Sequence, residues 1–216
     1  MYLYNLSLQG PTAINQAITG SFSAPKQYEV VVSRGAKVLE LYRFNDKTKI
    51  LDLVSSQEVF GLIRCIAPYR DYTITKDYLA IGSDSGRFVI LEYDPESQSF
   101  QKIQMETYGK TGCRRIVPGQ YVAVDPKGRT VMIAAVERSK FVYMLNRDDQ
   151  KLTISSPKEA HKSNVLTFDV IALDVDYENP LFACLEVEYG DIDNEDDPVN
   201  TGEPLKVLTF YEFDIG

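Results

Sequence analysis

Residues 78–95, YLAIGSDSGRFVILEYDP, carry the clearest structural signal in the chain. Two apolar runs, Tyr78–Ile81 and Phe88–Leu91, flank the polar triplet Asp84-Ser85-Gly86. Glycine adopts positive φ angles at little steric cost, and Asp and Ser are common where a chain reverses direction. The stretch therefore predicts a β-hairpin with a tight turn at the triplet.

The same hairpin pattern occurs three more times at an almost constant interval. The other copies are YEVVVSRGAKVLELYRFN from Tyr28, TVMIAAVERSKFVYMLNRD from Thr130, and LFACLEVEYGD from Leu181, which resumes as LKVLTFYEFD from Leu205. Consecutive copies start 50, 52 and 51 residues apart. Strand-built repeats of about 40–50 residues are typical of propeller blades. The repeat therefore predicts an all-β protein made of β-propeller blades of a non-WD type.

Further strands are predicted on both sides of each hairpin. One precedes each hairpin, at Ile14–Thr19, Leu62–Ala67, Tyr121–Asp125 and Asp169–Asp174, and a more polar one follows the first three, at Ile50–Ser55, Phe100–Thr107 and Lys151–Ser155. Each unit then has four antiparallel strands, and the expected units are residues 14–60, 61–110, 115–160 and 165–216, with an acidic insertion at 190–204. The last unit lacks its outer strand. Because propellers close with about four to eight blades, we expect an open arc from the N-terminal part of a longer protein.

The apolar pattern favours stacked blades over one flat sheet. In the hairpin strands nearly every position is apolar, as in Val30–Val32. A strand has this composition when both of its faces are buried. The outer strand at 100–107 alternates instead, with Gln104 between Ile103 and Met105, as expected when one face meets water. Each sheet is therefore predicted to lie between two neighbours, and an isolated arc with uncovered faces is expected to be poorly stable.

Composition limits the functions open to the chain. Its 216 residues include 23 basic and 31 acidic side chains, a formal net charge of −8, which disfavours electrostatic binding of nucleic acid over the whole surface. No stretch approaches the roughly 18 apolar residues of a membrane span, and residues 1–12 do not have the pattern of a signal peptide. Cys65, Cys113 and Cys184 are predicted to be reduced structural thiols. With a single histidine, no metal and no cofactor is predicted.

Three segments resemble ligand-binding or catalytic motifs without completing them. Residues 109–111, GKT, match the end of a phosphate-binding loop, but Gln104 stands where the motif needs its first glycine. Residues 190–200, GDIDNEDDPVN, alternate acidic side chains as a calcium loop does, but Asp196 replaces the glycine that such loops require. We expect a solvated insertion there, or secondarily a dock for a basic partner. His161 is accompanied by no nucleophile motif, and no residue is predicted to be catalytic.

A basic loop between glycines, residues 112–119 (GCRRIVPG), contains the adjacent pair Arg114 and Arg115. Guanidinium groups form bidentate bonds with carboxylates and phosphates, so these two residues are the candidate partner-binding residues of the chain. Alternatively, one of them ties the loop to a nearby acidic side chain. The sequence favours this structural role, because exposed arginine pairs are common and charge alone is weak evidence.

Long stretches of the sequence resemble one family of propeller proteins. They are MYLYNLSLQ at Met1, VVVSRG at Val30, GSDSGRFVILEYD at Gly82, GKTGCRRIVPGQYVAVDPKGR at Gly109, LNRDD at Leu145, KLTISSPKEAHK at Lys151, ENPLFACLE at Glu178 and LTFYEFD at Leu208. A chain without Trp cannot carry the Trp-Asp signature of WD repeats. It is similar instead to the family of the large damaged-DNA-binding protein subunit and the large cleavage-and-polyadenylation factor subunit, and above all to that family's splicing member.

This resemblance implies a function that composition and spacing do not reveal. Family members are several-fold longer, with three propellers and a helical C-terminal part, so the chain corresponds to about half of the first propeller. The splicing member is a nuclear, non-enzymatic scaffold of the splicing factor 3b complex, which joins the small nuclear ribonucleoprotein that recognises the intron branch site. The resemblance implies that it holds a HEAT-repeat subunit, a PHD-finger-like zinc protein and a small subunit, with RNA contact indirect or minor.

Two alternatives remain open at this stage. One is a scaffold of a related complex, either a ubiquitin-ligase adaptor or a polyadenylation factor. The other is a propeller hydrolase that uses a pair of carboxylates, which 31 acidic residues allow although no spacing selects a pair.

Overall fold

A computed structural model describes residues 4, 6, 8–59, 61–70, 75–109, 115–148, 151–160, 162–173, 176, 178–190 and 204–215. All of the helical or strand structure assigned to these residues is β-strand, with no helix among them. The strands form four antiparallel sheets in chain order. The first sheet contains β1 (Ile14–Gly20), β2 (Glu29–Arg34), β3 (Val38–Asn45) and β4 (Ile50–Glu58), and the second contains β5 (Ile63–Tyr69), β6 (Tyr78–Ser83), β7 (Arg87–Asp94) and β8 (Ser99–Thr107). The third sheet contains β9 (Tyr121–Val124), β10 (Thr130–Ala134), β11 (Lys140–Asp148), β12 (Lys151–Ile154) and β13 (Lys158–Glu159), and the fourth contains β14 (Val165–Leu173), β15 (Leu181–Glu188) and β16 (Leu205–Glu212). The predicted all-β fold is confirmed.

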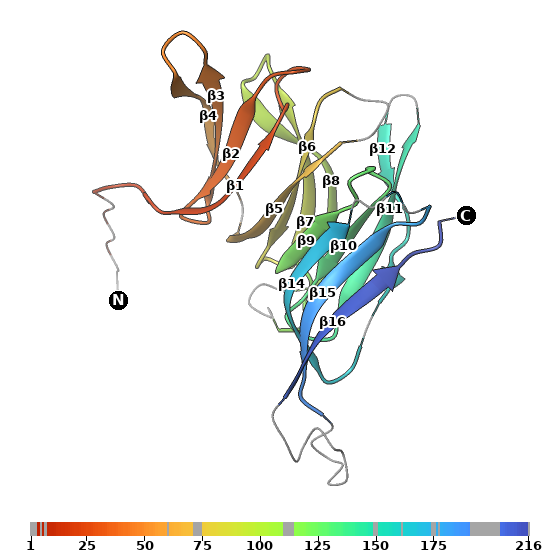
Figure 1. The fold of residues 1–216 in the computed structure, drawn as a ribbon. Coiled ribbons are helices and arrows are strands. Elements are labelled where there is room, and N and C mark those ends of the chain that lie inside the picture. The colour runs from red at the N-terminus through yellow and green to blue at the C-terminus, as the bar shows by residue number, and fades with distance from the viewer. Residues whose placement is uncertain are drawn as a thin grey trace.

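Each sheet is a meander in which a strand pairs with the next one along the chain, except that β13 pairs with β11 and not with β12. The four sheets follow one another side by side, and the first strands β1, β5, β9 and β14 are neighbours in that order (Figure 1). The turn predicted between β6 and β7 is present, with Gly86 at a φ of +69°. Short turns explain the pairing of β2 with β3, β3 with β4, β6 with β7 and β7 with β8, because a reversal of three or four residues places a strand beside its predecessor.

The hydrophobic core consists of three interfaces between successive sheets. Four consecutive residues of β10 show how the sheets share it. Val131 and Ile133 pack with the second sheet, whereas Met132 and Ala134 pack with the fourth. All four are fully buried. The prediction that the hairpin strands are buried on both faces is therefore confirmed for β10, since successive side chains point to opposite faces of a strand, but it is wrong for the last hairpin, where β15 and β16 leave Leu185, Leu208 and Phe210 exposed on one face.

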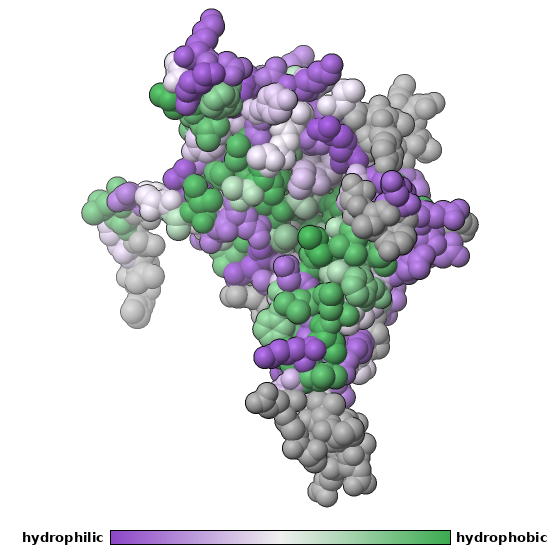
Figure 2. All heavy atoms as spheres, viewed as in Figure 1, coloured by the Kyte–Doolittle hydropathy of each residue, from purple (hydrophilic) through white to green (hydrophobic). Residues whose placement is uncertain are grey.

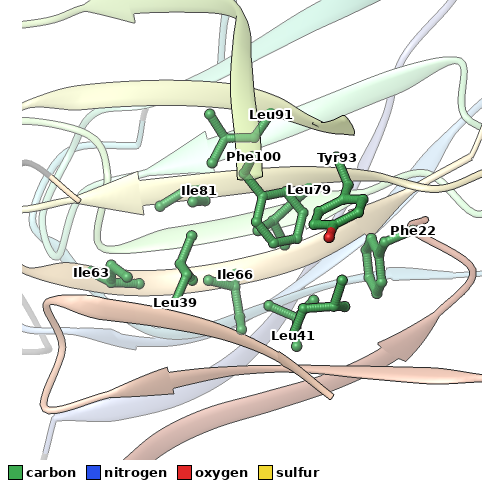
Figure 3. Close-up of a cluster of buried hydrophobic side chains, with 11 residues drawn as sticks. Phe22, Leu39, Leu41, Ile63, Ile66, Leu79, Ile81, Leu91, Tyr93 and Phe100 are labelled. Carbon is green, nitrogen blue, oxygen red and sulfur yellow. The ribbon is translucent and has the colours of Figure 1, made fainter. Parts of the chain in front are cut away.

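Aromatic rings fill the interface between the first and second sheets. Phe100 lies between Phe22 and Tyr93, with ring centroids 6.3 Å and 5.3 Å away and both pairs close to edge-to-face (Figure 3). Leu39 and Leu41 of β3 contribute the aliphatic part from the first sheet. Aromatic pairs at such angles add about 0.5–1.5 kcal/mol to what their buried area provides.

The outer strand of the third sheet differs from the prediction. A strand was expected at Lys151–Ser155, but β12 ends at Ile154 and a short second piece, β13, also pairs with β11. At the break, Met144 N–H donates to Ser155 Oγ over 2.9 Å, and Ser155 N–H donates to the Met144 carbonyl over 3.0 Å. Pro157 follows two positions later, and proline has no N–H for a ladder bond. The serine hydroxyl thus replaces a main-chain partner where the ladder is interrupted.

Both ends of the stack expose apolar side chains. On β14–β16, the face turned away from the third sheet carries Ile171, Leu185, Leu208 and Phe210, each between 49% and 59% exposed. Figure 2 shows hydrophobic residues gathered over this sheet. At the opposite end, the first sheet exposes Phe44, Leu51 and Leu53. Contiguous exposed apolar surface of this kind marks a face that another structural element covers.

Candidate functional site

Buried carboxylates occupy one end of each of the first three sheets. Glu29 begins β2, and Asp77 directly precedes β6. Asp125 directly follows β9, and all three residues are at most 4% exposed. They line a common open hollow of about 930 Å³ together with Arg70 and Lys26. These residues are the strongest candidates for acid–base chemistry in the described part of the chain.

Every one of these carboxylates is held by an arginine. Arg70 binds Asp77 through two parallel bonds, Nε to Oδ1 at 2.6 Å and Nη2 to Oδ2 at 2.7 Å. Arg129 binds Asp125 in the same way, at 2.8 Å and 3.0 Å. Because a bidentate arginine satisfies and neutralises a carboxylate, neither group is available as a free base or nucleophile.

Glu29 is held by an even larger set of donors. Its Oε2 accepts the main-chain N–H groups of Phe22 and Ser23 at 2.9 Å and 2.8 Å, and its Oε1 accepts Arg43 Nη2 at 2.9 Å. Asp77 additionally accepts Ser21 N–H at 2.6 Å, which joins the second sheet to the first. The carboxylates therefore fix loops at the ends of the sheets, which is a structural use of buried charge.

The candidate residue Arg115 lies in the connection between the second and third sheets. Its Nε donates to Glu137 Oε2, and its carbonyl accepts Glu137 N–H over 2.7 Å. Glu137 lies in the β10–β11 hairpin and is 3% exposed, whereas the Arg115 side chain is 73% exposed. The alternative raised by the sequence, an arginine that ties its loop to an acidic side chain, describes this contact. Partner binding by Arg115 stays a prediction.

Two further side chains complete the group around Glu137. Tyr189 OH donates to Glu137 Oε1, and Arg138 Nε lies 3.8 Å from the same oxygen. The hydrogen bond from Arg115, followed by that from Tyr189, lowers the pKa of the Glu137 carboxyl. The carboxylate thus stays ionised, with two guanidinium groups beside it.

The sequence alone did not identify Glu137 or Arg138 as site residues. The signal that could have found them is positional, because Glu137-Arg138-Ser139 occupies the hairpin turn where the second repeat has Asp84-Ser85-Gly86. A turn with arginine at a φ of +63° departs from the glycine usually found in that conformation.

Several sequence candidates lie outside the described residues. Arg114 is one of them, together with Lys110 and Thr111 of the phosphate-loop-like segment, Cys113, His161 and residues 191–203 of the acidic insertion. Gly109 is described, and its carbonyl lies against the β6–β7 turn at Gly86.

The two described cysteines are free thiols. Burial raises the pKa of Cys65 and raises that of Cys184 to about 12. Thiols with raised pKa values hold little thiolate at neutral pH and react slowly. Both cysteines therefore fit the structural role expected from the sequence.

A buried ion pair that the sequence did not indicate joins the third and fourth sheets. Lys140 Nζ of β11 lies 2.7 Å from Glu186 Oε1 of β15, without the alignment of a hydrogen bond, and both side chains are at most 1% exposed. Thr209 Oγ1 donates to Glu186 Oε2 over 2.6 Å, and Lys140 Nζ lies 5.7 Å from the centre of the Tyr211 ring. Two charges removed from water are thus matched by each other and by polar neighbours.

The described residues contain neither a cluster of metal ligands nor a membrane-spanning helix. No group of three or more His, Cys, Asp or Glu side chains there could hold a metal ion. No helix in that part of the chain is long and apolar enough to cross a membrane.

Comparisons with known proteins place the chain among propeller proteins. Residues 13–216 match the family described as the RSE1/DDB1/CPSF1 first beta-propeller. The chain is 54% identical over 217 aligned residues to Splicing factor 3B subunit 3 of Danio rerio, 52% to Spliceosome-associated protein 130 A of Arabidopsis thaliana, and 50% to Pre-mRNA-splicing factor RSE1 of Mycosarcoma maydis. Each alignment covers 100% of this chain and 18% of the relative, so the chain spans about a fifth of their length. The chain belongs to the RSE1/DDB1/CPSF1 first β-propeller family.

Proposed function

We propose that this chain is part of the first propeller of the third subunit of splicing factor 3b and acts in pre-mRNA splicing as a non-enzymatic nuclear scaffold. The observation that carries this proposal is the identity of 50–54% along the whole chain to proteins named as splicing factors. The four sheets are then successive blades, with repeat units at 14–60, 61–110, 115–160 and 165–216 and the acidic insertion at 190–204.

A scaffolding role is supported by how the buried charges are used. Carboxylates that could serve as an acid and a base are bound by Arg43, Arg70 and Arg129 within the described residues. Hydrolysis by a carboxylate pair requires one free carboxylate and one free acid at a fixed separation. The arrangement therefore favours a rigid binding framework over catalysis, and function lies in its surfaces.

The surfaces available for partners are of two kinds. The apolar end faces, carrying Leu208 and Phe210 at one end and Leu53 at the other, fit the neighbouring blades of a closed propeller. The loop ends, including Arg115, fit other subunits: a HEAT-repeat protein, a PHD-finger-like zinc protein and a small subunit of the same complex.

Affinity purification of the tagged full-length protein from nuclear extract, followed by mass spectrometry, tests the proposal. We expect near-stoichiometric recovery of the HEAT-repeat subunit and of other splicing factor 3b proteins. Recovery of ubiquitin-ligase or polyadenylation components in their place would keep the family and overturn the splicing assignment. Recovery of no partner would overturn the scaffold role.

A further inference from the structure

One buried carboxylate is shared by two exposed guanidinium groups at the loop end of the third sheet. Glu137 is 3% exposed, and its two oxygens already accept bonds from Arg115 and Tyr189. The side chains of Arg115 and Arg138 are 73% and 56% exposed. The anion is therefore buried with both oxygens hydrogen-bonded, and the two cations face water.

The charges of this group do not cancel. Two guanidinium groups and one carboxylate leave a net charge of about +1, in a chain whose formal charge is −8. The adjacent ion pair between Lys162 and Glu188 is balanced by itself. Among the described residues, the loop end thus carries a group of net positive charge on an acidic protein, which attracts a complementary anion.

Main-chain hydrogen bonds order the backbone that carries both arginines. Glu137 N–H donates to the Arg115 carbonyl over 2.7 Å, and Ser139 N–H donates to the Glu137 carbonyl over 2.7 Å. Thr167 N–H donates to the Val136 carbonyl over 2.7 Å and ties the hairpin to the fourth sheet. Pre-ordered donors lose less entropy on binding than flexible ones do.

We propose that Arg115 and Arg138 form a docking site for the carboxylates of an acidic, Asp- and Glu-rich segment of a protein partner. This proposal rests on the proposed scaffold function and identifies one surface through which the scaffold binds a partner. One carboxylate matches one planar guanidinium fork, so a net charge of about +1 is sufficient for such a contact. Nucleic-acid binding relies instead on many cations that neutralise successive phosphates, and this group supplies a single uncompensated one.

The test measures binding of a fluorescein-labelled peptide of alternating Glu and Asp, eight residues long, to the purified full-length protein at low salt. Two variants probe the site: Arg138→Asn and Arg115→Lys, the second keeping the charge next to Glu137 but losing the fork. Asparagine tolerates the positive φ of position 138. We expect each variant to weaken peptide binding about three- to tenfold.

A matched control is available at Lys49. This lysine is also a turn residue with a positive φ, +59°, and its side chain is 70% exposed, so Lys49→Asn removes the same charge from the same conformation elsewhere. We expect Lys49→Asn to bind the peptide like the unmodified protein. An equal loss in Lys49→Asn, or no loss in Arg138→Asn and Arg115→Lys, would overturn the site.

Two further arms separate the possible outcomes. The same titration is run with a 12-nucleotide single-stranded poly(U) RNA, and tighter, Arg138-dependent binding of that RNA would overturn the choice of a protein partner. Peptide binding is measured without other subunits, so it does not depend on which complex the protein joins. A failed titration together with recovery of the splicing complex would reject only the docking site, whereas a positive titration with other partners recovered would reject only the splicing assignment.

Discussion

Gln57 and Phe100 form two hydrogen bonds with each other. Gln57 Nε2 donates to the Phe100 carbonyl over 3.2 Å, and Phe100 N–H donates to Gln57 Oε1 over 2.7 Å, which joins β4 to β8. Gln16 joins β1 to β5 with a related pair of bonds to two different residues, donating to the Arg64 carbonyl and accepting Ile66 N–H. The primary amide has the same donor and acceptor as a peptide group, so it continues the main-chain ladder from one sheet to the next.

Replacing Gln57 by Leu is expected to loosen the outer edge between the first two sheets. The substitution keeps the bulk of the side chain and leaves Phe100 N–H and C=O without partners, at a cost of about 1–3 kcal/mol. Hydrogen exchange of the full-length protein, followed by mass spectrometry, should show faster exchange in β8. Gln101→Leu is the control, because the Gln101 side chain bonds only to Ser97 and Ser99 at the exposed surface. Equal protection of β8 in both variants would contradict this role.

Lys140→Met is expected to destabilise the junction between the third and fourth sheets strongly. It leaves the Glu186 carboxyl buried without its charged partner, and breaking one side of a buried pair costs about 3–5 kcal/mol. The double variant Lys140→Met with Glu186→Leu removes both charges and should recover most of the loss. Protection of β11 and β15 in hydrogen exchange measures the stability of the junction in the single and the double variant. A double variant as unstable as the single one would show that the pair itself, and not the orphaned charge, holds the junction.

The contribution of Glu137 to stability is expected to depend on pH. Its pKa is lowered in the folded protein by Arg115 and Tyr189, whereas an unfolded glutamate titrates near about 4.3. The folded state then binds fewer protons than the unfolded state, so the stabilisation is complete above that pH and is lost as pH falls through the lower folded value.

Glu137→Gln tests this linkage. We expect faster exchange in residues 130–145 of the variant at pH 7, and a difference from the unmodified protein that shrinks below about pH 4, after correction for intrinsic exchange rates. Tyr189→Phe removes one donor and keeps the carboxylate, so its effect should be smaller and should follow the same trend. A Glu137→Gln effect that is constant from pH 3.5 to pH 7.5 would refute the argument.

Gly82→Ala is expected to disturb the packing of the second sheet against the third. A Cβ at Gly82 would lie 2.4 Å from the Gly119 carbonyl oxygen and 2.9 Å from Val122 Cγ2. The nearer atom belongs to main chain, which cannot rotate away as a side chain does, and overpacking of this kind costs about 1–3 kcal/mol. Gly10→Ala is the control, since nothing lies within 4 Å of that position. The melting temperature of the full-length protein should fall for Gly82→Ala alone.

The sheets could be predicted from the sequence because their signals are local. Apolar runs interrupted by Asp84-Ser85-Gly86 identify a hairpin within 18 residues, and its repetition identifies the stack. The break at Ser155 was missed, although Pro157, two residues beyond the expected strand, indicates that strand pairing is interrupted there. The start of the strand before the last hairpin was also predicted wrongly, since β14 starts at Val165 and not at Asp169.

The site could be predicted only in part, because its contacts connect residues far apart in the chain. Arg115 could be selected from its charge, and an ion pair with a nearby acidic side chain was the alternative to partner binding. The acidic residue that Arg115 contacts, Glu137, is 22 positions away, and Tyr189 is 52 positions from Glu137. Which of 31 acidic residues an arginine meets is decided by how the sheets stack, and no local pattern encodes that. The Lys140–Glu186 pair was missed for the same reason.

The alternation of burial along β10 has a consequence for how mutations combine. Val131 and Met132 are covalent neighbours but belong to different interfaces, so their truncations should be coupled more weakly than those of two residues in one interface. Met132 and Cys184 are 52 positions apart, yet their sulfur atoms lie 3.9 Å from each other, so their truncations should be coupled. The stack is thermodynamically a one-dimensional array with nearest-neighbour terms, in which energetic coupling follows the order of sheets and is blind to peptide connectivity.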